Sequence, residues 1–204
     1  SPHFLTPLTR LDFTIFIVAH TVSPSLVQHS NHVPDTPQYN TYPIILQCSP
    51  KLLNVTGLQV CYYITGHGLG HATRCIKIIE YLISIGIKCY VVTNPYILSF
   101  IRTTLSDEAQ EHLTLQGRIL DGGAIQTNPL EVDAIATLNN YITILDQHEV
   151  LVAHEIDFLQ QNDIDIVLSD ATPLACRAGH FANCKVCIIS NFTWDYIYAE
   201  MLKD

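Results

Sequence analysis

From residue 58 onward, apolar and polar residues follow one another in blocks that match alternating strands and helices. Residues 58–65, "LQVCYYIT", form a continuous apolar run that stops before a glycine, which is typical of a strand buried on both faces. In residues 71–86, "HATRCIKIIEYLISIG", apolar residues recur at helical spacing, and Gly86 is a natural helix end. The apolar stripe of this predicted helix consists of Cys75, Ile76, Ile79, Leu82 and Ile83.

The same alternation continues along the rest of the chain. Strands are predicted in residues 87–94, 112–121, 163–170 and 185–190, and helices in residues 95–105, 130–161, 173–183 and 196–204. The long helical stretch 130–161 has room for one break. Strands that alternate with helices imply a parallel sheet with helices on both faces. The predicted fold class is therefore a doubly wound, Rossmann-like α/β domain.

The residues before this pattern have a different composition. Residues 23–54 are rich in Pro, Ser, Asn, His and Gln, as linkers are. Residues 11–22, "LDFTIFIVAHTV", are apolar, but the chain opens at Ser1 and no clean cleavage site follows. We interpret them as a strand or an upstream extension rather than a signal peptide. We expect an irregular N-terminal extension over residues 1–57 and one α/β domain over residues 58–204.

Composition and charge narrow the class of protein. The 204 residues carry a net charge of −9 and no Lys/Arg cluster, which argues against a nucleic-acid partner. No stretch is long enough to cross a bilayer, so we expect no stable membrane insertion. The seven cysteines lie mostly in apolar runs, which favours reduced core thiols and a cytoplasmic location. Cys184 and Cys187 form a C-x-x-C, but positions three apart on a strand face opposite ways, so a redox or zinc role is disfavoured.

The first predicted strand ends in a glycine-rich loop, "GHGLGH", in which Gly66, Gly68 and Gly70 lie beside His67 and His71. Glycines permit positive φ and close approach of backbone N–H groups, and the following helix start adds partial positive charge. A phosphate or carboxylate is the natural occupant. Two alternatives stay open, a tight turn without a ligand and a metal site formed by the two histidines, although no third ligand is near in sequence. We expect no metal.

Two common nucleotide-binding motifs can be tested directly against this loop. A dinucleotide fingerprint needs a glycine where His71 stands and an acidic residue after the second strand, but residues 83–106 contain neither Asp nor Glu. A Walker A loop needs a Gly-Lys pair, and no glycine here precedes a lysine. Both readings fail, and we expect no cofactor.

Four separate motifs, in order, carry a family resemblance. They are "YYITGHGLGHATR" (62–74), "DGGAIQ" (121–126), "VLSDATPLACRA" (167–178) and "NFTWDYIYAE" (191–200). Together they resemble the glycosyltransferase-like N-terminal region of plant-type L-arabinokinases and related bacterial proteins of the GT-B superfamily. The resemblance covers roughly residues 58–201 and does not extend to residues 1–57.

The resemblance implies the N-terminal half of a GT-B fold, in which two Rossmann-like domains face a cleft and the second holds most of the donor. The implied partners are a nucleotide sugar, a small sugar acceptor, and a downstream second Rossmann-like or kinase domain. In L-arabinokinases, sugar phosphorylation belongs to a downstream kinase domain with its own glycine-rich phosphate loop, and none of the nine glycines here sits in one. Two hypotheses stay open: sugar transfer, with this piece inactive alone, and a non-catalytic sugar-sensing or scaffold domain attached to a GHMP-type kinase.

The histidines are the leading catalytic candidates under the transfer hypothesis. Transfer to a hydroxyl benefits from a base, and histidine is suited near neutral pH. The resemblance places such a histidine at the cleft. We favour His71 at the helix start and His67 against the acceptor, and the reverse assignment stays open. Their alternative role is to cap the helix. The glycine amides and Arg74, one turn into the helix, are expected near the donor diphosphate, although Arg74 also fits a solvated helix face.

Acidic and aromatic residues are expected at the same sheet edge. Asp121 and Asp170 are each predicted to end a strand, where they can bind a sugar hydroxyl, orient a histidine, or simply cap the next turn. Asn191, Trp194 and Asp195 follow the last strand. An aromatic ring there can stack on a sugar face, but a single Trp is more often part of the core.

Overall fold

The computed structural model describes residues 57–128, 131–190 and 192–203, so almost all of the predicted N-terminal extension lies outside the described part. Its centre is a five-stranded parallel sheet in the order β3-β2-β1-β6-β7. The strands are β1 (Gln59–Ile64), β2 (Lys88–Thr93), β3 (Leu113–Gly117), β6 (Ile166–Asp170) and β7 (Lys185–Ile188). From β1 the chain first adds strands on one side (β2, β3) and then on the other (β6, β7), as in doubly wound sheets. The predicted fold class is confirmed.

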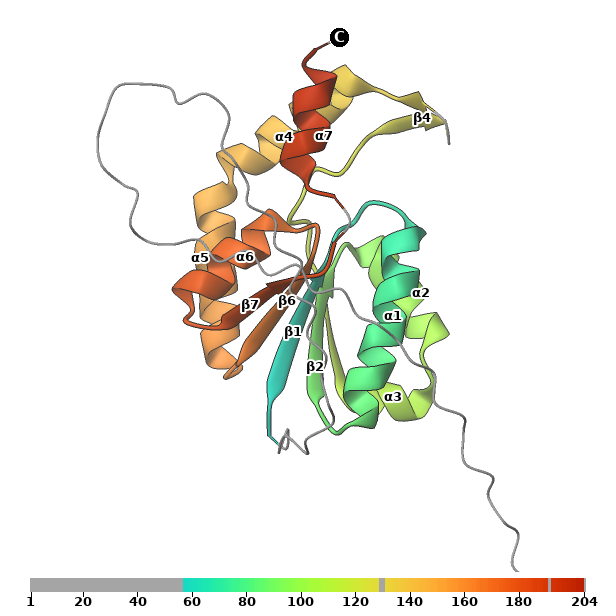
Figure 1. Cartoon of the computed structure of the whole chain (residues 1–204), viewed down its shortest axis with the longest axis vertical. Coiled ribbons are helices and arrows are strands. Elements are labelled where there is room, and N and C mark those ends of the chain that lie inside the picture. The colour runs from blue at the N-terminus through green and yellow to red at the C-terminus, as the bar shows by residue number, and fades with distance from the viewer. Residues whose placement is uncertain (1–56, 129–130, 191, 204) are drawn as a thin grey trace, which may run out of the picture.

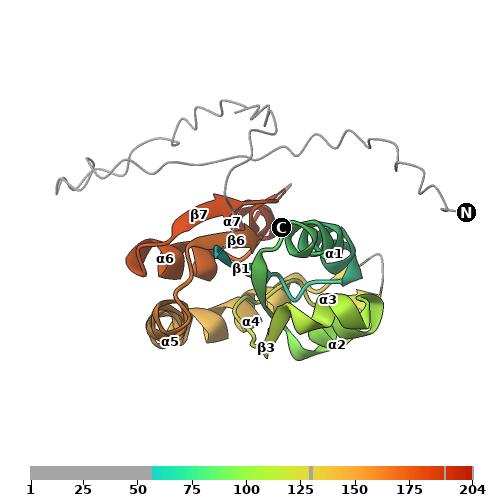
Figure 2. The same cartoon turned by 90° about the horizontal axis from the view of Figure 1, so that it is seen from below.

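Helices cover both faces of the sheet (Figure 1; Figure 2). One face carries α1 (Leu69–Ser84), α2 (Pro95–Thr104) and the short α3 (Asp107–Glu111), and the other carries α5 (His148–Gln161) and α6 (Pro173–Phe181). Side chains of β1 alternate between the two layers: Tyr62 packs with α1, and Tyr63 packs with α5 and α6. All five residues after Gln59 in β1 are buried, which explains its continuous apolar run.

The carboxyl ends of the strands point toward a second group of elements. These are α4 (Ala134–Asp146), α7 (Trp194–Met201) and the small antiparallel pair β4 (Gln126–Asn128) and β5 (Glu131–Val132). Figure 1 shows α4 and α7 beyond the upper end of the sheet, where β1 passes into α1. These two helices therefore lie next to the carboxyl edge of the sheet.

Three sequence predictions need correction. The helical stretch predicted from residue 130 begins only at Ala134, because Glu131–Val132 pair with β4 and the Asp133 side chain accepts a hydrogen bond from the Ala136 N–H as the helix cap. Its one break falls at Gln147, between α4 and α5. The short α3 was not predicted. Strand β3 ends at Gly117, so Asp121 lies in the loop beyond the strand rather than at its end.

Two further features concern the described part of the chain. All six cysteines within it are free thiols. None of its helices combines the length and the apolar character needed to cross a membrane.

Candidate functional site

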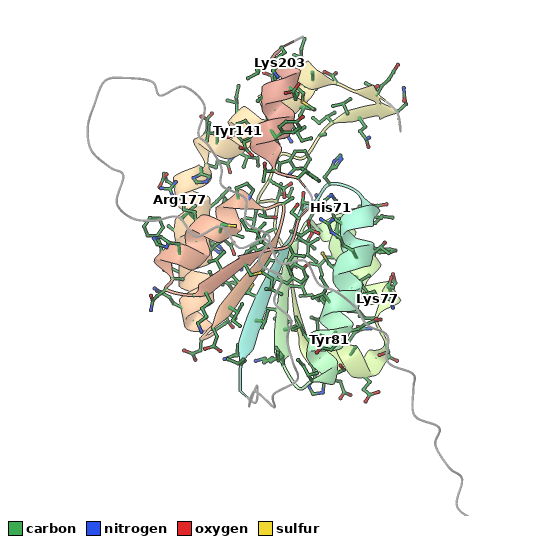
Figure 3. All side chains as sticks on the ribbon, viewed as in Figure 1. His71, Lys77, Tyr81, Tyr141, Arg177 and Lys203 are labelled. Atoms are coloured by element: carbon green, nitrogen blue, oxygen red, sulfur yellow. The ribbon has the colours of Figure 1, made fainter. Side chains whose placement is uncertain are left out.

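After the glycine-rich loop, the His71 and Arg74 side chains both contact the Asp170 carboxylate. Asp170 is the last residue of β6, beside β1 in the sheet, whereas His71 and Arg74 lie in the first two turns of α1. His71 Nδ1 lies 2.9 Å from Asp170 Oδ1, and Arg74 Nε donates to Asp170 Oδ2 at 2.9 Å. An Arg74 terminal nitrogen also pairs with Asp170 Oδ1. Figure 3 shows His71 at the upper end of α1, level with the end of the sheet.

The shared carboxylate determines which His71 nitrogen carries a proton. Arg74 Nη2 also lies 3.0 Å from His71 Nδ1, but a guanidinium only donates and an ionised carboxylate only accepts. Nδ1 cannot donate to Asp170 and accept from Arg74 at the same time. We assign the proton to Nδ1, since Asp170 is an ionised acceptor within hydrogen-bond distance. In the neutral ring, Nε2 then carries the free lone pair.

Asp170 is completely buried, yet it is held as an anion. Burial raises the pKa of a carboxyl, but hydrogen bonds from His71, Arg74 and the Cys75 thiol outweigh burial and lower the pKa of Asp170 overall. The Cys75 Sγ lies 3.0 Å from Asp170 Oδ2 and 3.1 Å from the Tyr62 hydroxyl oxygen. Burial, followed by the charge of Asp170, raises the pKa of that thiol well above its ordinary value. Cys75 is therefore a neutral donor beneath the ion pair rather than a nucleophile.

His67 occupies a different environment from His71. Its Nδ1 accepts a hydrogen bond of 3.3 Å from the Ala124 N–H, and its ring meets the Trp194 ring edge to face at 5.3 Å. Burial, together with the positive charge that His71 can carry, lowers the pKa of His67. His67 thus links the glycine-rich loop to the loop after β3 and to α7 as a neutral ring.

The three glycines of the loop play distinct roles. Gly68 has a φ of +75° and forms the N-cap of α1 without a side-chain hydrogen bond. Gly66 lies so near α2 that a Cβ there would be 2.9 Å from the Cβ of Asn94. The space around Gly70 is open, with nothing within 4 Å of a Cβ built at that position. The Gly66 N–H donates to Asp121, so this amide has an internal partner.

Asp121 forms the inner end of the site. Burial raises its pKa to about 6, although hydrogen bonds from Thr65, the Gly66 N–H and Thr172 act in the opposite direction. The Thr172 hydroxyl lies 3.5 Å from Asp121 Oδ2. Asp121 also lines a cavity of about 230 Å³ that reaches α4 and α7. A carboxyl whose pKa is close to neutrality at a cleft is a candidate functional group.

Aromatic rings form a wall over the histidines. Phe192 meets the His71 ring at 5.3 Å and the Trp194 ring at 5.1 Å, both edge to face. Trp194 in turn stacks on Tyr198 at 5.5 Å. Trp194 is therefore both buried and part of the site. Asp195 is exposed at the rim of the cavity, and the predicted residue Asn191 lies outside the described residues.

The structure thus gathers most of the predicted residues but adds several that the sequence did not single out. Arg74 binds Asp170 instead of standing on a solvated helix face. The additional contributors are Thr65, Cys75, Tyr141, Thr172, Phe192 and Tyr198. Thr172 and Phe192 lie within the quoted motifs, which was the available signal, whereas Tyr141 lies in none of them. Within the described ranges, no group of three or more His, Cys, Asp or Glu residues is arranged to hold a metal ion.

Comparison with solved structures gives several matches of low similarity. They include UGT89C1 of Arabidopsis thaliana complexed with UDP (TM-score 0.46, 16% identity, 63% of this chain and 34% of that chain). A second match is the glycosyltransferase of kitacinnamycin (TM-score 0.43, 15% identity, 71% of this chain and 34% of that chain). A third is the C-terminal domain of PF1911 hydrogenase from Pyrococcus furiosus (TM-score 0.39, 11% identity, 66% of this chain and 92% of that chain). At these values the matches carry no argument, and the fold assignment rests on the sheet itself.

Comparison of sequences is more informative. No known protein-family profile matches the chain. The chain is, however, similar to L-arabinokinase of Arabidopsis thaliana, with 38% identity over 145 residues. The matched region makes up 70% of this chain but only 14% of that much longer protein.

Proposed function

We propose that this chain is the acceptor-side domain of a GT-B glycosyltransferase-like unit within a longer protein, where it handles a nucleotide sugar and a sugar acceptor. The observation that carries the proposal is the bond between His71 and the buried Asp170 at the carboxyl edge of the sheet. In such sheets, ligands bind at this edge. The similarity to L-arabinokinase and the four motifs agree with a role in sugar metabolism.

The chemistry follows from the assigned proton positions. Nδ1 of His71 donates to Asp170, so Nε2 accepts the proton of an acceptor hydroxyl as its oxygen attacks the anomeric carbon of the donor. The bond from that carbon to the nucleoside diphosphate breaks, and the diphosphate leaves with the bonding electrons. Asp170 holds the ring in one orientation and stabilises the imidazolium that forms. Arg74 keeps Asp170 ionised throughout.

In our proposal, this domain makes the smaller contribution to binding of the nucleotide-sugar donor. A second Rossmann-like domain would hold most of the nucleotide, and the open backbone at Gly68 and Gly70 would face its diphosphate. Since that second domain belongs to the longer protein, residues 1–204 alone are expected to give no turnover.

A second candidate function is a non-catalytic sugar-sensing or scaffold domain attached to a GHMP-type sugar kinase. Two observations favour it. The similar protein is named as a kinase, and Arg74 is engaged by Asp170 rather than left open toward an anion. Under this proposal His71 positions the loop and no group is transferred.

The deciding experiment uses the longer protein and radiolabelled nucleotide sugars with monosaccharide acceptors. Transfer predicts that His71→Ala lowers the rate about 10²- to 10⁴-fold, the usual contribution of a general base. His112→Ala, which changes an exposed histidine far from the edge, is the matched control and should retain full activity. Sugar phosphorylation without any transfer, unchanged by His71→Ala, would reject the transferase in favour of the sensing domain.

A further inference from the structure

The cavity beyond Asp121 is separate from the reacting histidine. It lies between α4, the start of α6 and α7, and has a volume of about 230 Å³. His71 and His67 are not among the residues that line it, because Trp194 and the loop around Gly122 stand between. Figure 3 shows Tyr141 on α4, above the sheet and well apart from His71 on α1. A ligand in this cavity would therefore not be the group that His71 deprotonates.

The size and charge of the cavity restrict its ligand. Drug-sized ligands occupy cavities of roughly 300 Å³ or more, so this space suits a single ring rather than a nucleotide sugar. Among the described residues, no Lys or Arg lines it, whereas Asp121 and Asp195 do. This absence of cations disfavours a phosphate or another anion. The ligand is expected to be small and uncharged.

The walls combine flat aromatic faces with hydrogen-bonding groups. Tyr141 and Tyr198 have their rings 4.6 Å apart, and Tyr198 stacks on Trp194. Trp194 and Tyr198 are almost completely buried, so Tyr141, which is 36% exposed, has most of the aromatic surface that is left open. One face of a sugar ring is made of C–H groups that pack well on such rings, while its hydroxyls require polar partners at the edge. Asp121 and His148 also line the cavity and bring polar atoms to it.

An unpartnered group inside the wall is an independent indication of a ligand. Trp194 is only 4% exposed, yet its Nε1–H has no hydrogen-bond partner among the described residues. Buried donors without partners are rare in folded proteins because they lose their bonds to water. Trp194 also lines the cavity, but this nitrogen itself has almost no exposed surface, so a ligand hydroxyl would reach it only after a small turn of the ring.

We propose that the cavity between α4, α6 and α7 is a binding site for one uncharged monosaccharide ring, which packs on the Tyr141 ring and hydrogen-bonds to Asp121. The site goes beyond the proposed transfer, because it lies apart from His71 and binds sugar whether or not the longer protein transfers one. Asp121 also accepts from the Gly66 N–H, so an occupied cavity is in contact with the glycine-rich loop.

The test uses Trp194, which is the single tryptophan of the chain, as a fluorescence reporter. The whole chain is titrated with L-arabinose, D-xylose and D-glucose, and with p-cresol as an apolar ring, and each titration is repeated by calorimetry. At least one sugar should give a saturable change in emission with matching heat. Asp121→Asn should weaken that binding about tenfold, because a charged hydrogen-bond acceptor is replaced by a neutral one.

Two substitutions on the same helix locate the site. Ile144→Phe places a larger side chain in the cavity wall and should abolish sugar binding, whereas Ile142→Phe changes an exposed position that does not line the cavity and should leave it unchanged. Binding of p-cresol but of no sugar, or equal effects of the two Phe substitutions, would overturn the proposal. His71→Ala should keep full sugar binding, so a failure of transfer and a failure of this site are told apart.

Discussion

The Thr172 hydroxyl at the edge of the sheet lies 3.5 Å from the Asp121 carboxylate and 3.3 Å from the backbone carbonyl of Asp170, and the carboxyl pKa values of these two aspartates shift in opposite directions. Burial raises the pKa of both. For Asp121 burial dominates and the pKa is about 6, whereas for Asp170 the bonds from His71, Arg74 and Cys75 outweigh burial. Neighbouring carboxyls with separated pKa values commonly have separate roles. Asp170 is the fixed anion, and Asp121 is the group that changes charge near neutral pH.

The raised pKa of Asp121 predicts a pH-dependent stability. Its pKa in the folded chain, about 6, exceeds the ordinary 3.8, so the folded state binds the proton more tightly than the unfolded state. This term therefore lowers the free energy of unfolding as pH rises from about 4 to about 6, by up to about 3 kcal/mol in total. Asp121→Asn, which keeps an oxygen for the Thr65 and Gly66 donors, should remove that fall and be the more stable protein above pH 6.

Urea denaturation of both proteins between about pH 4 and pH 7 measures this effect. The informative quantity is the difference between the two unfolding free energies, because all other titrating groups contribute equally to both. A difference that stays constant over this range would show that Asp121 does not titrate there in the folded protein.

Arg74 is predicted to stabilise the fold mainly by pairing with Asp170. Arg74→Ala leaves a completely buried carboxylate without its cation and should lower the free energy of unfolding by about 3 kcal/mol. This value is at the lower end of the range for breaking a buried ion pair, because the Arg74 side chain is 35% exposed. Lys77→Ala, on the same helix, breaks only an exposed pair with Glu80 and should change stability by less than about 0.5 kcal/mol.

The pH response separates this prediction from a simple packing defect. Because the folded-state pKa of Asp170 is lowered, its stabilising contribution is present above pH 3.8 and is lost as pH falls below that value. The stability of Arg74→Ala should therefore fall less than that of the wild type as pH drops below 3.8. If Arg74→Ala and Lys77→Ala had similar stabilities at neutral pH, the pair would contribute nothing measurable.

The sequence alone predicts the sheet, and it singles out both His71 and Asp170 as site candidates, for a clear physical reason. Buried parallel strands must be nearly continuous apolar runs, so the polar residues that end them stand out, as Asp170 does after β6. His71 was likewise predicted at the start of the first helix, where it lies. Their contact joins positions 99 residues apart and exists because β6 pairs with β1, which no local pattern encodes.

Local patterns also misplaced two segments, and both lie beyond the carboxyl edge. The apolar pair Ile119–Leu120 follows β3 closely, so Asp121 was assigned to the end of a strand that stops at Gly117. The two-residue strand β5 is too short to produce a period, and it was absorbed into the predicted helix. The cavity formed by these loops with α4 and α7 could not be predicted, since it depends on tertiary placement alone.

A second buried charge, Glu155, is predicted to be structural. It lies in α5 with no exposed surface, where Arg118 Nη1 donates to both carboxylate oxygens at 2.5–2.6 Å and the Tyr63 hydroxyl donates at 2.8 Å. Arg118→Ala should lower the free energy of unfolding by about 3–5 kcal/mol, because the carboxylate stays buried without its cation. Tyr63→Phe removes one bond to a charged group and should cost about 1.5–3 kcal/mol.

His154 offers the control for this network. It contacts Glu155 at 3.3 Å, but its side chain is 61% exposed, so His154→Ala should change the free energy of unfolding by less than about 0.5 kcal/mol. Chemical denaturation of the three variants gives the ranking. A His154→Ala effect as large as that of Arg118→Ala would mean that the exposed ring, and not the guanidinium, keeps the carboxylate in place.

Substitution of Gly66 and of Gly70 by alanine is predicted to have opposite effects on the free energy of unfolding. Gly66→Ala would put a Cβ 2.9 Å from the Cβ of Asn94, whose Oδ1 accepts the hydrogen bond that caps α2. Either the loop or the cap must move, so we expect a loss of about 1–3 kcal/mol in the free energy of unfolding. Gly70→Ala meets nothing within 4 Å and lies within α1, so it should be neutral or stabilise by up to about 1 kcal/mol.

The same pair separates loop geometry from ligand contact. If the backbone near Gly70 faces a donor diphosphate, Gly70→Ala should reduce transfer by the longer protein while leaving its stability intact, because the added methyl group occupies space that the fold leaves open. Gly66→Ala should reduce both together, since it displaces the loop that carries His71. Full transfer activity in Gly70→Ala would show that the diphosphate does not approach this turn, and the donor would then have to be held by the second domain alone.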